Sequence, residues 1–104
     1  MNNNRIYYTL LVHVLKDKYG IFNEYEDKVL PLLHEYNGKL ELRIKTEKSS
    51  EETNKPDEIH IISFGSDNDF QNYLNDEERK KYRHLFEESV GKSTIIKGKN
   101  LVNN

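Results

Sequence analysis

The stretch PDEIHIISFGSDNDFQNYLNDEERKKYRHLFEESV, from Pro56 to Val90, decides the fold of this chain. Within it, Glu58 to Phe64 is a short run with three isoleucines and a phenylalanine that lies between Pro56 and Gly65. A run of this length and composition between two such breakers predicts a β-strand. Ser66 follows the turn as a candidate helix N-cap, with acidic residues in the first turn that the helix dipole favours.

The second half of the stretch has the apolar spacing of helices. Side chains that would share an apolar stripe recur three or four positions apart: Phe70, Tyr73, Leu74, Tyr82, Leu85, Phe86 and Val90. A second start signal interrupts this stripe, with Asn75 as cap and Glu78 at the capping-box position, and Gly91 ends it. The pattern therefore predicts either one kinked helix or two short ones after the strand.

The chain before this stretch begins with a strand and a helix. Residues Ile6 to Leu15 are β-branched, aromatic and aliphatic, as in a strand buried on both faces. After Lys16 to Gly20, a helix of about seventeen residues is expected from the spacing of Phe22, Tyr25, Val29, Leu33 and Tyr36. Pro31 should kink this helix, and Asn37-Gly38 supplies its C-terminal stop.

Two further strands complete the pattern. Lys39 to Lys45 alternates, which places Leu40, Leu42 and Ile44 on one face of a strand. Thr46 to Asp57 is polar and without periodicity, as in a hairpin loop, and Ser93 to Val102 is expected to be the last strand.

The element order is therefore βαββαβ, the split βαβ arrangement of ferredoxin-like α+β folds. We expect residues 1–104 to form one domain, with both helices on one face of a four-stranded antiparallel sheet. Right-handed crossovers give the strand order 4-1-3-2. The other sheet face would be a large apolar surface, so a second copy of the sheet is expected to cover it in a two-fold homodimer.

Composition excludes several classes of protein. The net charge of −2 gives no electrostatic reason to expect a nucleic acid or an anionic membrane as partner. The chain has no cysteine, which excludes disulfides and thiol chemistry. No apolar run approaches the roughly 20 residues of a membrane span, and the start MNNNR lacks the apolar core of a signal peptide. A cytoplasmic location is expected.

Four runs carry a family resemblance: KVLPLLHEYNG, LELRIK, PDEIHIISFGSDNDFQNYLNDEERKKYRHLFEES and IIKG. They resemble an uncharacterised bacterial family of the dimeric α/β-barrel superfamily, over roughly residues 6 to 102. That superfamily is similar in fold to antibiotic-biosynthesis monooxygenases and muconolactone isomerases. The resemblance implies dimerisation and a small-molecule cavity, and it transfers no catalytic residue.

Candidate site residues come from the predicted topology. The end of strand one carries His13, and the start of strand three carries Glu58 and His60. The later part of strand two brings Arg43 to the same end of the sheet. We expect His60 to act as acid or base and Arg43 to bind a substrate carboxylate or enolate. Further substrate-binding candidates are His13, Glu58 and Tyr7, the last as a hydroxyl donor in a cavity wall.

A structural role is the alternative for each of these residues. His60 can be a satisfied structural or interface histidine, and His13 can end its strand at solvent. Arg43 can form an ion pair with Glu58 or Glu41 across the hairpin. The pairing register decides which of these side chains share a face.

Several chemistries lack their motifs. The chain has no His-x-His, no HExxH, no glycine-rich phosphate loop and no GxSxG, so neither a metal nor another cofactor is expected. Haem-degrading members of the superfamily carry a tryptophan in the pocket, and this chain has none.

Two function classes remain open from the sequence. One is a cofactor-independent enzyme that acts on a small organic acid or aromatic metabolite, with His60 and Arg43 at its site. The other is a non-catalytic dimer that binds a metabolite or a protein. An enzyme needs His60 to face a closed cavity, whereas a binding module needs only a cavity or an exposed patch.

Overall fold

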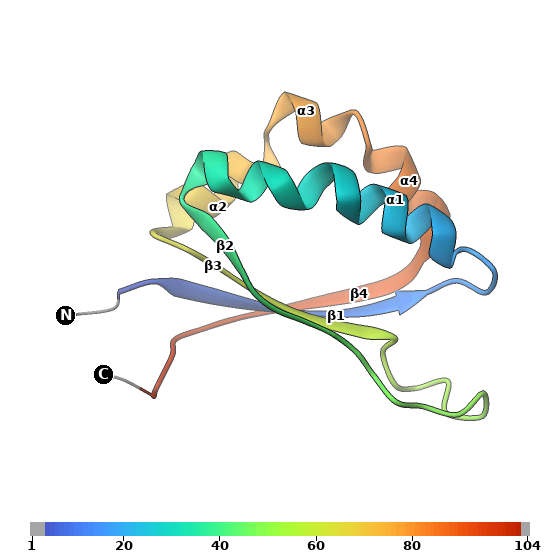
Figure 1. Cartoon of the computed structure of the whole chain (residues 1–104). Helices are drawn as coiled ribbons and strands as arrows, with labels where there is room; N and C mark the ends of the chain where they lie inside the picture. Colours follow the sequence, from blue (N-terminus) through green and yellow to red (C-terminus); the bar gives the residue numbers. More distant parts are fainter. Residues whose placement is uncertain (1–3, 103–104) are drawn as a thin grey trace.

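The computed structural model describes residues 4–102, in which helices cover one face of a four-stranded antiparallel sheet (Figure 1). The strands are β1 (Ile6–Val14), β2 (Gly38–Lys45), β3 (Glu58–Phe64) and β4 (Val90–Gly98). The helices are α1 (Tyr19–Val29), the 3-10 helix η1 (Leu30–Tyr36), α2 (Asp67–Leu74), α3 (Glu77–Lys80) and α4 (Arg83–Ser89). The strand order is β2-β3-β1-β4, which is 4-1-3-2 counted from the other edge. The predicted ferredoxin-like α+β fold is confirmed.

The first helix changes character at its proline. α1 ends at Val29, and the chain continues as η1 with Pro31 in its first turn. Proline has no N–H to donate and disfavours regular α-helix, which accounts for the predicted irregularity. Asn37 then adopts a left-handed conformation with φ of 59° and ends η1 directly before β2.

Three short helices replace the one or two expected after β3. Ser66 caps α2 as predicted, since its hydroxyl accepts a hydrogen bond from the N–H of Asp69 at 3.1 Å. The second cap is Asp76 and not Asn75, because Oδ1 of Asp76 accepts from the N–H of Arg79 at 2.7 Å. The helical stripe therefore breaks twice, and α3 is a four-residue helix over the sheet.

β4 starts earlier than its sequence pattern indicates. It runs from Val90 to Gly98, whereas Ser93 to Val102 was expected, and it follows α4 without a loop. Val90 completes the helical stripe of the sequence, so spacing alone does not separate the end of the helix from the start of the strand.

β2 contains a bulge that the alternating sequence hides. Leu40 pairs with Ile62 but Leu42 pairs with Ile61, so Glu41 is an extra residue in the strand. Leu40 therefore lies on the helix-covered face, near the side chains of η1, and the residues from Leu42 onward keep their expected faces. The common face predicted for the apolar residues of β2 is wrong for Leu40, because strict alternation fails at a bulge.

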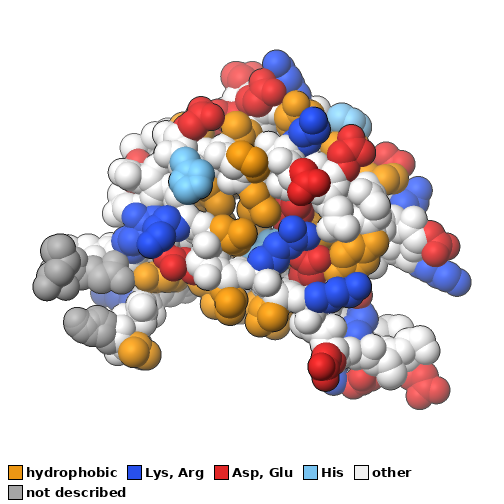
Figure 2. Space-filling model, viewed as in Figure 1, with side chains coloured by type: hydrophobic (Ala, Val, Ile, Leu, Met, Phe, Trp, Pro, Cys, Tyr) orange, Lys and Arg blue, Asp and Glu red, His pale blue; other side chains and the backbone are white. Residues whose placement is uncertain are grey.

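The main core lies between the sheet and the helices, whereas the opposite sheet face is open. The core consists of Tyr8, Leu33, Ile62, Phe64, Phe70 and Tyr73. On the open face, Leu42, Ile44 and Ile96 keep 45%, 44% and 54% of their surface exposed. Figure 2 shows hydrophobic side chains exposed along the underside of the sheet. Among residues 4–102, no helix is both long and apolar enough to cross a membrane.

Candidate functional site

A cavity of about 340 Å³ lies between the helices and the covered face of the sheet. Its walls are largely apolar and come from the sheet and from the helices that cover it: Leu10 and Val12 of β1, Phe22 and Val29 of α1, Phe70 of α2 and Phe86 of α4. Three ionisable side chains besides tyrosines reach this cavity, namely Glu26, His60 and Arg79. An apolar cavity of this size with a few polar groups is typical of a small-molecule site.

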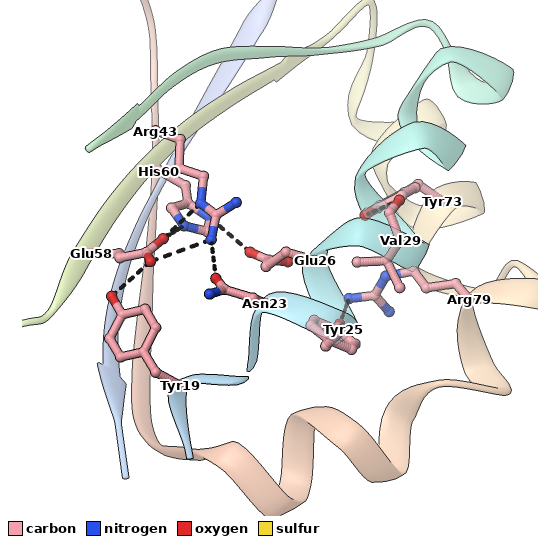
Figure 3. Close-up of polar contacts among 10 residues, drawn as sticks. All are labelled: Tyr19, Asn23, Tyr25, Glu26, Val29, Arg43, Glu58, His60, Tyr73 and Arg79. Carbon is pink, nitrogen blue, oxygen red and sulfur yellow. Dashed lines mark hydrogen bonds and ion pairs between the residues drawn. The ribbon is translucent and has the colours of Figure 1, made fainter. Parts of the chain in front are cut away.

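Glu26 and His60 form a buried acid–base pair in the cavity wall. Oε2 of Glu26, on α1, lies 3.2 Å from Nδ1 of His60, on β3 (Figure 3). Burial raises the pKa of Glu26 to about 7, because the charged carboxylate loses its hydration. Burial also lowers the pKa of His60, although the hydrogen bond to Glu58 acts in the opposite direction. The pair therefore changes its protonation close to neutral pH.

Glu58 holds the imidazole from the other side. Its Oε1 lies 2.8 Å from Nε2 of His60, and its Oε2 accepts a hydrogen bond from the hydroxyl of Tyr19 at 2.7 Å. The guanidinium of Arg43 donates to both oxygens of Glu58, at 2.8 and 3.3 Å. Burial alone would raise the pKa of Glu58, but the hydrogen bonds from Arg43, His60 and Tyr19 outweigh it and lower that pKa.

This arrangement selects the tautomer of His60. An ionised Glu58 carboxylate can only accept, so Nε2 of the imidazole carries a proton and donates it. In the neutral ring, Nδ1 is then the acceptor and faces the Glu26 carboxyl. Within residues 4–102, the Glu26 side chain has no other hydrogen-bond or ion-pair partner, so one proton is shared between Glu26 and His60.

The structure divides the residues predicted from the sequence between two faces of the sheet. His60 lines the cavity, and behind it, outside the cavity lining, the buried Glu58 forms an ion pair with the half-buried Arg43. The predicted alternative role of Arg43 as a partner of Glu58 is therefore present in the structure. His13 follows Val12 on β1 and faces away from the helices, and Tyr7 lies on the same open face. The structure thus brings three of the five candidates together.

Sequence reasoning missed two cavity residues, Glu26 and Arg79. Glu26 carried a usable signal, because its spacing of four from Phe22 and three from Val29 places a carboxylate within the apolar stripe of α1. Arg79 carried no such signal, because its position over the cavity depends on the break between α2 and α3. In the part of the chain that the structure describes, no cluster of three histidine or acidic side chains has the arrangement of a metal site.

Comparison with known proteins gives structural likeness only. No family model matches the chain, and no curated protein matches it. A crystal structure of a protein of unknown function from Rhodopseudomonas palustris has a TM-score of 0.81 and 17% identity, over 98% of this chain and 86% of that chain. A dimeric protein of unknown function with a ferredoxin-like fold from Bacteroides fragilis has a TM-score of 0.74 and 12% identity, over 96% of this chain and 100% of that chain.

A third similar structure is described as a putative antibiotic biosynthesis monooxygenase from Bacteroides thetaiotaomicron. It has a TM-score of 0.73 and 11% identity, over 95% of this chain and 91% of that chain. These neighbours bear out the predicted resemblance to ferredoxin-like proteins of unknown function and to monooxygenase-like proteins. At such identities the likeness establishes the fold.

Proposed function

We propose that this protein is a cofactor-independent enzyme that moves a proton on a small organic acid or aromatic metabolite, with the Glu26–His60 pair as its acid and base. The observation that carries this proposal is the position of the pair in the wall of an apolar cavity, where Oε2 and Nδ1 lie 3.2 Å apart. A group that takes and returns a proton needs a pKa near the working pH, and the pKa of Glu26 is about 7.

The reaction that suits these groups is a keto–enol isomerisation. The deprotonated pair removes a proton from the carbon next to a carbonyl, and the C–H electron pair becomes the new C=C bond. The carbonyl π electrons move to oxygen, and the protonated pair returns its proton there. Atoms and electrons balance without an oxidant, a reductant or a metal.

Arg43 and Glu58 act in this proposal as positioning residues. Their ion pair holds the Nε2 side of His60 and keeps Nδ1 directed at Glu26. Direct binding of a substrate by Arg43, Glu58, His13 or Tyr7 stays a prediction from the sequence.

The test is an enolisation assay with phenylpyruvate, which has an aromatic ring, a carboxylate and an enolisable CH₂ group. The expected result is a rate above the buffer background that Glu26→Gln and His60→Gln each lower at least about 100-fold, as removal of an acid–base group does. Glu24→Gln is the matched control, because Glu24 is an exposed residue of α1.

Two outcomes would count against this function. One is an unchanged rate in both variants, which would place the chemistry elsewhere. The other is binding of aromatic acids in the cavity with no catalysed enolisation of phenylpyruvate, which would favour the alternative, a non-catalytic binding module.

We also propose that the open sheet face forms a two-fold homodimer. Leu42, Ile44 and Ile96 leave this face apolar and exposed, and the similar Bacteroides fragilis protein is dimeric. A cytoplasmic location likewise remains a proposal from the sequence.

A further inference from the structure

We infer that Arg79 binds the anionic group of the substrate, so that the cavity selects an aromatic or alicyclic molecule carrying a carboxylate or enolate. This inference rests on the proposed function, because Arg79 lines the same cavity as Glu26 and His60. In the view of Figure 3, Glu26 lies between His60 and Arg79.

Among residues 4–102, no carboxylate forms an ion pair with the guanidinium of Arg79. Its Nε is buried and has no hydrogen-bond partner in that part of the chain. Its other nitrogens make long contacts, at 3.5 Å to the carbonyl of Leu74 and 3.4 Å to the hydroxyl of Tyr25. A buried donor left unpaired costs free energy, which a ligand acceptor would recover.

Two other arginines, Arg43 on β2 and Arg83 on α4, differ from Arg79 because each has a carboxylate partner. Arg43 is paired with Glu58 at 2.8 Å, and Arg83 with Glu87 at 3.2 Å. Only Arg79, of these three, reaches the cavity lining.

The position of Arg79 is fixed by its backbone. Asp76 caps α3 and accepts from the N–H of Arg79 at 2.7 Å, and the hydroxyl of Tyr36 on η1 donates to the other oxygen of Asp76. The guanidinium lies 4.9 Å from the centre of the Tyr73 ring. A short helix held at its N-terminal cap by these hydrogen bonds, with the guanidinium against an aromatic ring, therefore presents this cation to the cavity.

The net charge and the walls of the cavity indicate the charge and polarity of the ligand. Below the Glu26 pKa of about 7 the pair holds one proton and is neutral, so the cavity carries the single positive charge of Arg79, which favours a monoanion. Aromatic and aliphatic side chains make up the walls, so the body of the ligand is apolar. A guanidinium donates to a carboxylate in a planar, two-pronged manner, which an amide reproduces poorly.

The experiment measures binding of two isosteric probes that cannot react, 3-phenylpropionate and 3-phenylpropanamide, by calorimetric titration at pH 6, below the Glu26 pKa of about 7. The intact protein should bind the carboxylate about tenfold more tightly than the amide. Arg79→Gln should abolish this preference, Arg79→Lys should keep part of it, and Lys80→Gln should leave it unchanged as an exposed neighbour on the same helix. Thermal unfolding of each variant verifies that it is folded.

Each other outcome overturns the assignment of Arg79. Equal affinity for the two probes, binding of neither, or a preference that survives in Arg79→Gln removes the anion site. The two proposals can fail independently. Glu26→Gln should lose the enolisation of phenylpyruvate, which tests the proposed function, yet keep the preference for 3-phenylpropionate, which tests Arg79.

Discussion

Glu26 on α1 and His60 on β3 come from opposite layers of the fold, yet Oε2 and Nδ1 lie 3.2 Å apart with both side chains almost fully buried. Two ionisable groups taken out of water in this way cannot both keep their ordinary protonation. Their environment raises the pKa of Glu26 and lowers that of His60, which leaves one proton to be shared. The pair therefore makes stability, as well as proposed activity, depend on pH.

Glu26→Gln should stabilise the protein at alkaline pH. The pKa of the Glu26 carboxyl is about 7 in the folded chain and 4.5 in the unfolded chain. The free energy of unfolding therefore falls as pH rises from 4.5 to 7, because the unfolded chain ionises first. The difference of about 2.5 units, at 1.36 kcal/mol each, predicts a gain of about 3 kcal/mol above pH 8. Glutamine keeps a donor for Nδ1 and cannot ionise.

Urea unfolding between pH 4 and 9 measures this effect. The gain should disappear near pH 4, where the wild-type carboxyl is protonated in both states. Glu24→Gln, on the exposed side of α1, should change stability little at any pH. A Glu26→Gln variant that is less stable than the wild type at pH 9 would contradict a shared proton in this pair.

Arg43→Ala should destabilise the protein by about 3 kcal/mol at pH 7, because it leaves the Glu58 carboxylate buried without its cation. Glu58 has a lowered pKa, so its stabilising contribution is present above its ordinary pKa and is lost as pH falls through the lower folded value. The loss in the variant should therefore be largest above pH 5 and shrink toward pH 3.

The double variant Arg43→Ala/Glu58→Gln is the control for this prediction. The double variant leaves no unpaired charge buried. In denaturant unfolding it should therefore regain part of the free energy of unfolding that Arg43→Ala loses. The single variant Glu58→Gln completes the comparison. If the double variant lost as much free energy of unfolding as the two single variants together, the ion pair would not be what holds the site.

Gly38→Ala should destabilise the fold by about 1–3 kcal/mol. An added Cβ would lie 2.7 Å from a ring carbon of Phe64 and 2.9 Å from the carbonyl oxygen of Leu33, so buried groups would have to move. Gly20→Ala is the matched control in α1, where nothing lies within 4 Å, and it should be neutral or stabilising. Thermal unfolding of both variants compares the two sites, and equal stability would contradict the close packing at Gly38.

The order of elements was predictable because apolar periodicity and breakers such as Pro31 and Gly65 are local signals. The bulge at Glu41 was not, since only pairing with β3 shows that the alternation slips there. The site residues likewise divide into those that topology could place and those that it could not. His60 and Arg43 could be placed at one end of the sheet by topology. The position of Arg79 depends on the direction of the chain between α2 and α3, which the start signal at Asn75 did not fix.

The open sheet face gives the last prediction, that the protein is a dimer which Ile96→Glu converts to a monomer. Ile96 pairs with Thr9 and Thr9 with Ile61, so these side chains line one apolar face on which a charge opposite a second copy would be desolvated. Light scattering at micromolar concentration should give twice the mass of the chain for the wild type and for Lys16→Glu, an exposed loop control. In the single chain, 54% of the Ile96 surface is exposed. A monomeric wild type would contradict the dimer and would mean that this apolar face stays open to solvent or binds another protein.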